Sequence, residues 1–150
     1  MSAVALLDVN LLIALIDPRH VHHEAAHHWF AARDSGPWAS CALTQNAVLR
    51  IVGHPRYPNA PGSPAAVSAI LRQLIRHPQH LYWSEAPSLL GMPHVDSAAL
   101  IDAGQITDRY LLALAVHHGG RLATLDQRLS TRAVSGGDHA LERINVSPSA

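Results

Sequence analysis

The strongest constraint on the fold is a recurring pattern in which a short apolar segment stops at an acidic residue and a segment of helical spacing follows. Residues 3–7 (AVALL) are apolar and stop at Asp8, and residues 121–126 (RLATLD) repeat this arrangement with Asp126. Short apolar runs of this kind are typical of buried strands. The pattern therefore predicts strands that deliver carboxylates to one end of a sheet.

The intervening segments show the three- to four-residue apolar spacing of helices. This spacing predicts helices over residues 9–17, 20–34, 44–53, 64–77, 95–104 and 107–118. Short apolar runs predict further strands over residues 38–43, 80–83 and 142–147. Thr44 and Thr107 are expected to cap their helices, and residues 54–64, with four prolines, to form a rigid loop. In residues 20–34, the expected inward-facing side chains are Val21, Ala25, Trp29 and Ala32. Strands that alternate with helices predict one domain over residues 1–150, a three-layer α/β fold with a mainly parallel central sheet.

Composition removes several functional classes. The chain has 150 residues, 48% of them apolar, which suffices for one buried core. Its Lys+Arg total of 11 equals its Asp+Glu total, and every positive residue is Arg, which excludes P-loop and Schiff-base chemistry because both need a lysine amine. The single Cys41 excludes a disulfide framework. Without an export signal or a membrane-spanning apolar run, the chain is expected to be cytoplasmic.

Three aspartates satisfy the rule that open α/β sheets bind ligands beyond the carboxyl ends of their strands. Asp8 and Asp126 end strands, and Asp108 stands in the first turn of a predicted helix. Carboxylates gathered at short range repel one another unless a cation neutralises them. Mg²⁺ or Mn²⁺ is the expected cation, because both prefer carboxylate and water ligands.

A competing motif lies in residues 23–27, which read HEAAH and match the HExxH pattern of zinc proteases. Two histidines one helical turn apart could bind Zn²⁺ while Glu24 activates water. The chain contains 12 histidines, however, so a chance match is easier than usual. A zinc protease is therefore kept as an alternative.

Taken together, several segments resemble the PIN-domain family, and within it the VapC-type toxin ribonucleases of bacterial toxin–antitoxin systems. The matching stretches are LLDVNLLIAL, HVHHEAAHHWF, WASCALTQNAVLRIVGHPRYPN and ITDRYLLALAVHHGGRLATLD, and they follow the family's order over roughly residues 4–130. The resemblance implies a PIN-like α/β/α fold and an endoribonuclease that acts with Mg²⁺ or Mn²⁺. It also implies an RNA substrate, with tRNA weakly favoured, a homodimer, and an antitoxin that blocks the site.

Specific residues are carried over from this resemblance. Asp8, Asp108 and Asp126 would hold the ion, with Asn10 and Thr124 as polar neighbours of the first and last acids. The expected chemistry is in-line attack on phosphorus by a water molecule that the ion activates. Five arginines are candidates for contacts with phosphates: Arg19, Arg50, Arg56, Arg109 and Arg128. Of these, Arg50 and Arg109 are assigned to RNA binding, and Arg50 is favoured.

The sequence departs from the family at one site position. The family's Thr-Glu-Asn stretch reads Thr44-Gln45-Asn46, so an amide replaces an acidic member of the site. Gln45 could still ligate a metal ion through its oxygen, but it brings no charge. Weaker metal binding is expected, and a catalytically weakened interaction protein with the same fold is the second alternative.

Overall fold

A computed structural model describes residues 3–33 and 36–146, so the predicted helix end at Asp34 lies outside the described residues. Its centre is a five-stranded sheet with the order β3-β2-β1-β4-β5, and all of the strand pairs are parallel. The strands are β1 (Ala5–Leu7), β2 (Trp38–Cys41), β3 (His80–Trp83), β4 (Arg121–Thr124) and β5 (Leu141–Arg143). The helices are α1 (Val9–Ile16), α2 (His23–Ala32), α3 (Ala42–Val52), α4 (Pro64–Ile75), α5 (Ile106–His117) and α6 (Gly137–Ala140).

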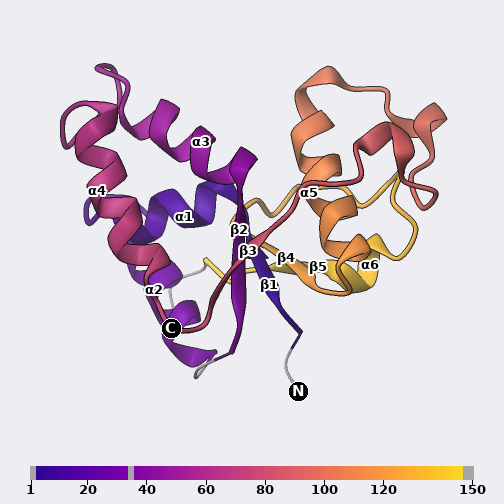
Figure 1. Cartoon of the computed structure of the whole chain (residues 1–150), viewed down its shortest axis with the longest axis horizontal. Helices are drawn as coiled ribbons and strands as arrows, with labels where there is room; N and C mark the ends of the chain where they lie inside the picture. The colour runs from indigo at the N-terminus through magenta and orange to yellow at the C-terminus, as the bar shows by residue number, and fades with distance from the viewer. Residues whose placement is uncertain (1–2, 34–35, 147–150) are drawn as a thin grey trace.

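Two layers of helices cover the sheet, with α1 to α4 on one side and α5 and α6 on the other (Figure 1). Side chains of a strand alternate between the two faces of the sheet. Accordingly, Leu7 packs in the core beneath α1 to α4, whereas Leu6 packs in the core beneath α5. The predicted three-layer α/β fold with a parallel sheet is confirmed.

The predicted inward stripe of helix α2 is correct only in part. Trp29 packs against the core as predicted, together with Phe30, and the buried residue of the helix is Ala26. Val21 precedes the helix and is 84% exposed, and Ala32 is exposed in its last turn. The stripe starts from Val21, which is not helical, so its spacing does not match the packed face along its whole length.

The predicted helix over residues 95–104 is also wrong. The chain forms two 3₁₀ turns there, η2 (Ser97–Ala99) and η3 (Ala103–Gln105). Asp96 and Asp102 each accept a hydrogen bond from the backbone N–H two residues later. Such local bonds compete with helical hydrogen bonding and favour isolated turns.

The two predicted threonine caps occupy other positions. Helix α5 begins at Ile106, so Thr107 lies inside its first turn and Gln105 is the N-cap. Helix α3 begins at Ala42, and Thr44 accepts a hydrogen bond from the backbone N–H of Cys41, 3.0 Å away. The end of α5 is confirmed, because Gly119 adopts the left-handed conformation (φ 69°) that favours glycine after a helix.

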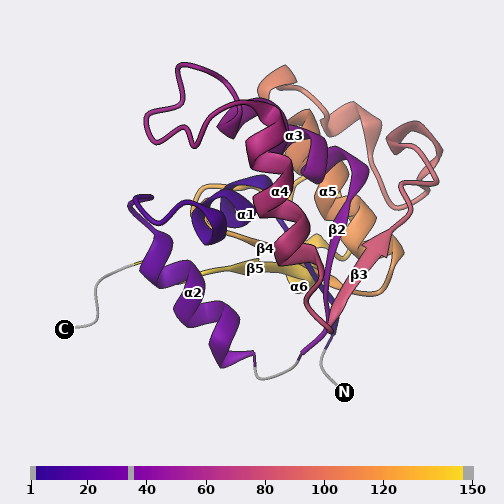
Figure 2. The same ribbon diagram turned by 60° about the vertical axis from the view of Figure 1, so that its left-hand side comes forward.

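The loop between α3 and α4 extends beyond the ends of both helices (Figure 2). It is anchored by Asp17, which is buried at the end of α1 and accepts hydrogen bonds from Tyr57 Oη and from Asn59 Nδ2. The predicted loop is confirmed up to Ser63, since Pro64 begins α4, and its rigidity stays a prediction.

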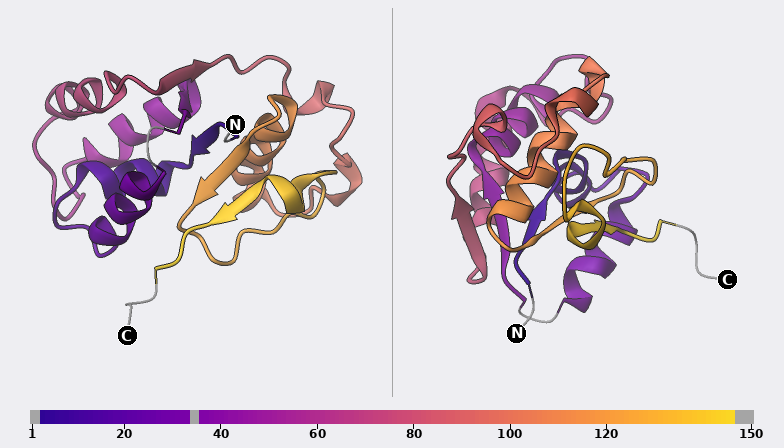
Figure 3. Two further views of the ribbon diagram at one scale, coloured as in Figure 1. Left: turned by 90° about the horizontal axis from the view of Figure 1, so that it is seen from below. Right: turned by 90° about the vertical axis from the view of Figure 1, so that its right-hand side faces the viewer.

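At the far side of the sheet, β5 lies beside β4 (Figure 3). Trp29 Nε1 on α2 donates a hydrogen bond of 2.6 Å to Glu142 Oε2 on β5 and so ties this edge to the helical layer. Among the described residues, no helix has the length and apolar character needed to cross a membrane.

Candidate active site

Asp8 follows β1 directly and is the N-cap of α1. Its Oδ1 accepts a hydrogen bond from the backbone N–H of Val9 at 2.8 Å, and its own N–H donates to the Ala123 carbonyl on β4. The side chain is only 4% exposed. The end of the strand thus places a buried carboxylate between β1 and β4, as the sequence pattern predicts.

Asn10 and Thr124 fix the position of this carboxylate. Thr124 Oγ1 donates to Asp8 Oδ2 at 2.8 Å and accepts a hydrogen bond from Asn10 Nδ2 at 3.1 Å. Asn10 Oδ1 in turn accepts from the backbone N–H of Leu125. The structure therefore brings both polar residues of the predicted set into contact around Asp8.

Asp126 and Asp108 approach the same end of the sheet from two further segments. The backbone N–H of Asp126 donates to Thr124 Oγ1 at 3.0 Å, and its Oδ1 accepts from the N–H of Arg128 at 2.9 Å. Asp108 lies in the first turn of α5, where the positive end of the helix dipole favours a negative charge. Both carboxylates are half-buried.

The pKa shifts show that the three aspartates act on one another. The pKa of Asp8 is raised to about 6, chiefly by burial and to a smaller extent by the charges of Asp108 and Asp126, while the hydrogen bonds from Thr124 and Val9 oppose the rise. Burial and the charge of Asp126 raise the pKa of Asp108, whereas the neighbouring Arg109 lowers it. Keeping these three negative charges at one end of the sheet therefore costs free energy.

This cost predicts a pH-dependent difference between the wild type and Asp8→Asn in EDTA. Because the pKa of Asp8 is about 6 in the folded protein and 3.8 in the unfolded reference, its charge destabilises the fold above pH 6. The free energy of unfolding of the variant should exceed that of the wild type by about 2 to 3 kcal/mol at pH 8. The difference should shrink as the pH falls through 6 toward 3.8. Urea unfolding at several pH values measures it, and a difference that does not change with pH would contradict the shift.

The donor set fits a hard divalent cation. Carboxylate oxygens are the ligands that Mg²⁺ and Mn²⁺ prefer, and a cation would relieve the repulsion that raises the pKa values of Asp8 and Asp108. Within residues 3–33 and 36–146, no three His, Cys, Asp or Glu side chains converge as a preformed metal site. The aspartates are therefore close enough to interact electrostatically without meeting at a common point.

Gln45 lies in the second turn of α3. Its Nε2 donates a hydrogen bond of 2.9 Å to the Oγ of Ser40, which is also 2.7 Å from His80 Nε2. The amide nitrogen is therefore committed to a buried hydroxyl on β2. The side chain is half-buried.

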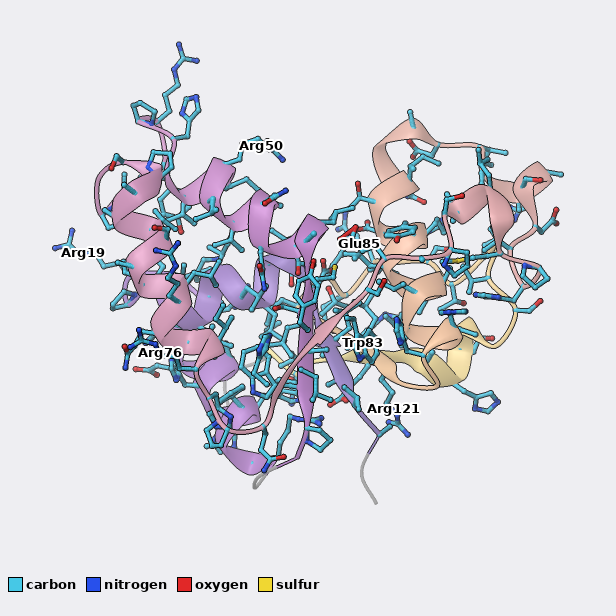
Figure 4. The ribbon with its side chains drawn as sticks, in the orientation of Figure 1. Arg19, Arg50, Arg76, Trp83, Glu85 and Arg121 are labelled. Carbon is cyan, nitrogen blue, oxygen red and sulfur yellow. The ribbon has the colours of Figure 1, made fainter. Side chains whose placement is uncertain are left out.

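The arginines predicted to contact RNA differ in their environments. Arg109 is 7% exposed, and its guanidinium donates to the Ser130 carbonyl and to Gln105 Oε1. These hydrogen bonds hold the loop beside α5, and the assignment of Arg109 to RNA binding stays a prediction. Arg50 is exposed on the last turn of α3 and projects outward (Figure 4). Arg128 is exposed two residues after Asp126.

The histidines of the HExxH pattern cap the end of α1. Pro18 has no N–H group, so the Ala14 carbonyl lacks its helical donor. His23 Nδ1 donates to this carbonyl at 2.7 Å, and His27 Nε2 donates to the Leu15 carbonyl at 2.8 Å. Helix capping therefore accounts for the one-turn spacing of these histidines.

One further acidic residue, which is not among the predicted site residues, lies at this end of the sheet. Glu85 lies two residues after β3, and its Oε2 accepts a hydrogen bond of 2.7 Å from the N–H of Leu43 at the start of α3. The pattern that predicted Asp8, a short apolar strand followed by an acidic residue, also occurs at β3 and Glu85.

Comparisons with known proteins identify the family. The model of the PIN domain family matches residues 5–134. Ribonuclease VapC44 of Mycobacterium tuberculosis is 45% identical over 132 residues, which cover 88% of this chain and 92% of the relative. Ribonuclease VapC29 of the same species is 38% identical over 125 residues, covering 83% and 87%.

A solved structure shares the fold. It is the crystal structure of VapBC2 from Rickettsia felis bound to a DNA fragment from their promoter. Its TM-score is 0.61 with 9% sequence identity, and the match covers 95% of this chain and 99% of that chain. The chain therefore belongs to the PIN-domain family, and its relatives place it in the VapC group of that family.

Proposed function

We propose that this protein is a divalent-metal-dependent endoribonuclease and the toxin of a toxin–antitoxin pair. The observation that carries the proposal is the position of the acids: Thr124 Oγ1 hydrogen-bonds both the Asp8 carboxylate and the backbone N–H of Asp126, and Asp108 lies in the first turn of α5. The names of the relatives, which are ribonucleases of the VapC group, supply the substrate class.

In this proposal Asp8, Asp108 and Asp126 hold Mg²⁺ or Mn²⁺. The cation, when bound, would polarise a water molecule and the phosphate oxygens of the RNA. Thr124 and Asn10 keep the Asp8 carboxylate in place through their hydrogen bonds. Arg50 and Arg128 are exposed and are the proposed phosphate contacts. Single-stranded or loop RNA, including the loops of tRNA, suits the site because its backbone is accessible.

The proposed partners follow from the same relatives. The Rickettsia felis structure is named as a VapBC2 complex, so we propose that a cognate antitoxin binds this chain and blocks its site. We also propose that the toxin is a homodimer that acts in the cytoplasm, as the family resemblance implies.

The proposal is tested by incubating the purified chain, free of antitoxin, with structured RNA and Mn²⁺ or Mg²⁺. We expect endonucleolytic cuts that EDTA prevents, and sequencing of the RNA ends identifies the cleaved sites. Intact RNA at every ion concentration would support the second alternative, an interaction protein that has lost its chemistry through Gln45.

A further inference from the structure

Charged residues are unevenly distributed along the chain. Residues 36–84, which include β2, α3, α4 and β3, contain four arginines and no acidic residue. Residues 85–105, which include η2 and η3, contain three acidic residues and no arginine. The neutral total of the chain therefore combines a cationic segment of formal charge +4 with a following acidic segment of formal charge −3.

The fold separates these two segments in space. Residues 85–105 lie against α5, where Tyr110 Oη donates to the Glu85 carbonyl and His94 Nε2 is 2.9 Å from the Ala113 carbonyl. Helices α3 and α4 lie on the other side of the strands, beside α1 (Figure 1). Asp8 stands between them, because it follows β1, the central strand of the sheet. The candidate site therefore has a cationic flank, residues 36–84, and an acidic flank, residues 85–105.

Three exposed arginines lie on the cationic flank and in the turn beside it. Arg50 is on the last turn of α3, Arg56 is in the loop that follows, and Arg19 is in the turn after α1. Figure 4 shows the side chains of Arg19 and Arg50 pointing away from the ribbon. Within the described residues, the guanidinium groups of these three arginines form no hydrogen bond or ion pair. Their charges are therefore available to a ligand in solution.

A buried carboxylate joins the two loops that carry Arg19 and Arg56. Asp17 is 5% exposed, and its Oδ1 accepts a hydrogen bond of 2.9 Å from the backbone N–H of Arg19. Its Oδ2 accepts from Tyr57 Oη and, at 2.9 Å, from Asn59 Nδ2. Because Asp17 is buried, it offers a ligand no accessible negative charge. Cationic groups on loops held in this way lose less conformational freedom when they bind.

We propose that Arg19, Arg50 and Arg56 form a docking surface for single-stranded RNA, so that the RNA strand leaves the site over α3 and not over residues 85–105. The inference rests on the proposed function, which supplies the RNA. The aspartates of the site repel a polyanion, so its affinity has to come from positive charge nearby. Asp96 and Asp102 are exposed on the acidic flank and repel phosphates there. The single contact proposed for Arg50 thereby becomes part of a longer surface.

The experiment measures binding of a fluorescent single-stranded RNA by anisotropy in EDTA, which prevents the proposed cleavage, over a range of salt concentrations. Each phosphate contact with a single strand contributes about 0.7 to the slope of log affinity against log salt. The double variant Arg50→Gln with Arg56→Gln should therefore make the slope shallower by about 1.4. Urea unfolding should give the same midpoint as the wild type, because neither side chain has a partner in the described residues.

The matched control is the double variant Arg121→Gln with Arg132→Gln. Both of these arginines are exposed, and they lie at the start of β4 and in the loop before α6. The control removes the same charge from outside the cationic flank, so it should change the salt slope by less than about 0.7, the contribution of one contact. Ultraviolet crosslinking of the RNA followed by mass spectrometry traces the path of the strand. We expect crosslinked peptides from residues 50–60 and none from residues 96–105.

Three outcomes overturn the inference. Equal losses in the two double variants reduce the effect to net charge, and crosslinks in residues 96–105 reverse the path of the strand. Unchanged RNA binding by Arg50→Gln with Arg56→Gln leaves the surface to another partner, such as an acidic protein. All three results leave the proposed function intact if the wild type cleaves RNA with Mn²⁺. Conversely, RNA binding that depends on these arginines in a wild type that does not cleave supports the docking surface and removes the proposed function.

Discussion

Replacing Asp8 with asparagine is expected to lower the rate of RNA cleavage by about 10²- to 10³-fold, the size of effect seen when one electrostatic group is removed from an active site. Asp8 is the most buried of the three aspartates, and Thr124 and Val9 fix both of its oxygens. Asparagine keeps the size of the side chain but removes the charge that the proposed cation needs. The measurement is the initial rate of cleavage of a labelled RNA at saturating Mn²⁺.

The control for this variant is His23→Ala, which removes a helix-capping histidine of the HExxH pattern. It should lower stability through the unsatisfied Ala14 carbonyl but preserve cleavage at temperatures where the protein is folded. Retained activity in Asp8→Asn together with lost activity in folded His23→Ala would move the active site to the histidines and restore the zinc alternative.

Replacing Trp38 with alanine is expected to lower the free energy of unfolding by about 3 to 5 kcal/mol, the usual cost of removing a buried aromatic side chain. Trp38 is 1% exposed at the start of β2. Its ring packs against Phe30 and His80, and its Nε1 donates a hydrogen bond of 3.2 Å to His77 Nδ1. The substitution leaves a cavity where α2 and the segment that follows α4 meet the sheet. Urea unfolding at pH 7 measures the loss.

Tyr82→Ala is the matched control, because Tyr82 is an aromatic residue on the neighbouring strand β3 and is 60% exposed. Its loss should cost less than about 1 kcal/mol, as is usual for surface positions. Similar costs for the two variants would contradict the assignment of Trp38 to the core.

The predictions that the structure confirms each depend on only a few neighbouring residues. The apolar runs that end at Asp8 and Asp126 identified β1 and β4 because burial of a strand requires such a run. The predictions failed where contacts distant in sequence decide the outcome. His23 and His27 face the end of α1 because Pro18 leaves a carbonyl unsatisfied, and a helical pattern contains no signal of that need.

The same distinction applies to the candidate site. The sequence by itself determined the acids, because carboxylates at strand ends and in a first helical turn follow from local patterns, and it determined the parallel α/β class. The tertiary structure alone decided that Arg109 is buried in internal hydrogen bonds and that Glu85 lies against α3. The reason is physical. A hydrogen bond between segments forms only when packing of the sheet and its helical layers brings them together, and that packing depends on the whole chain.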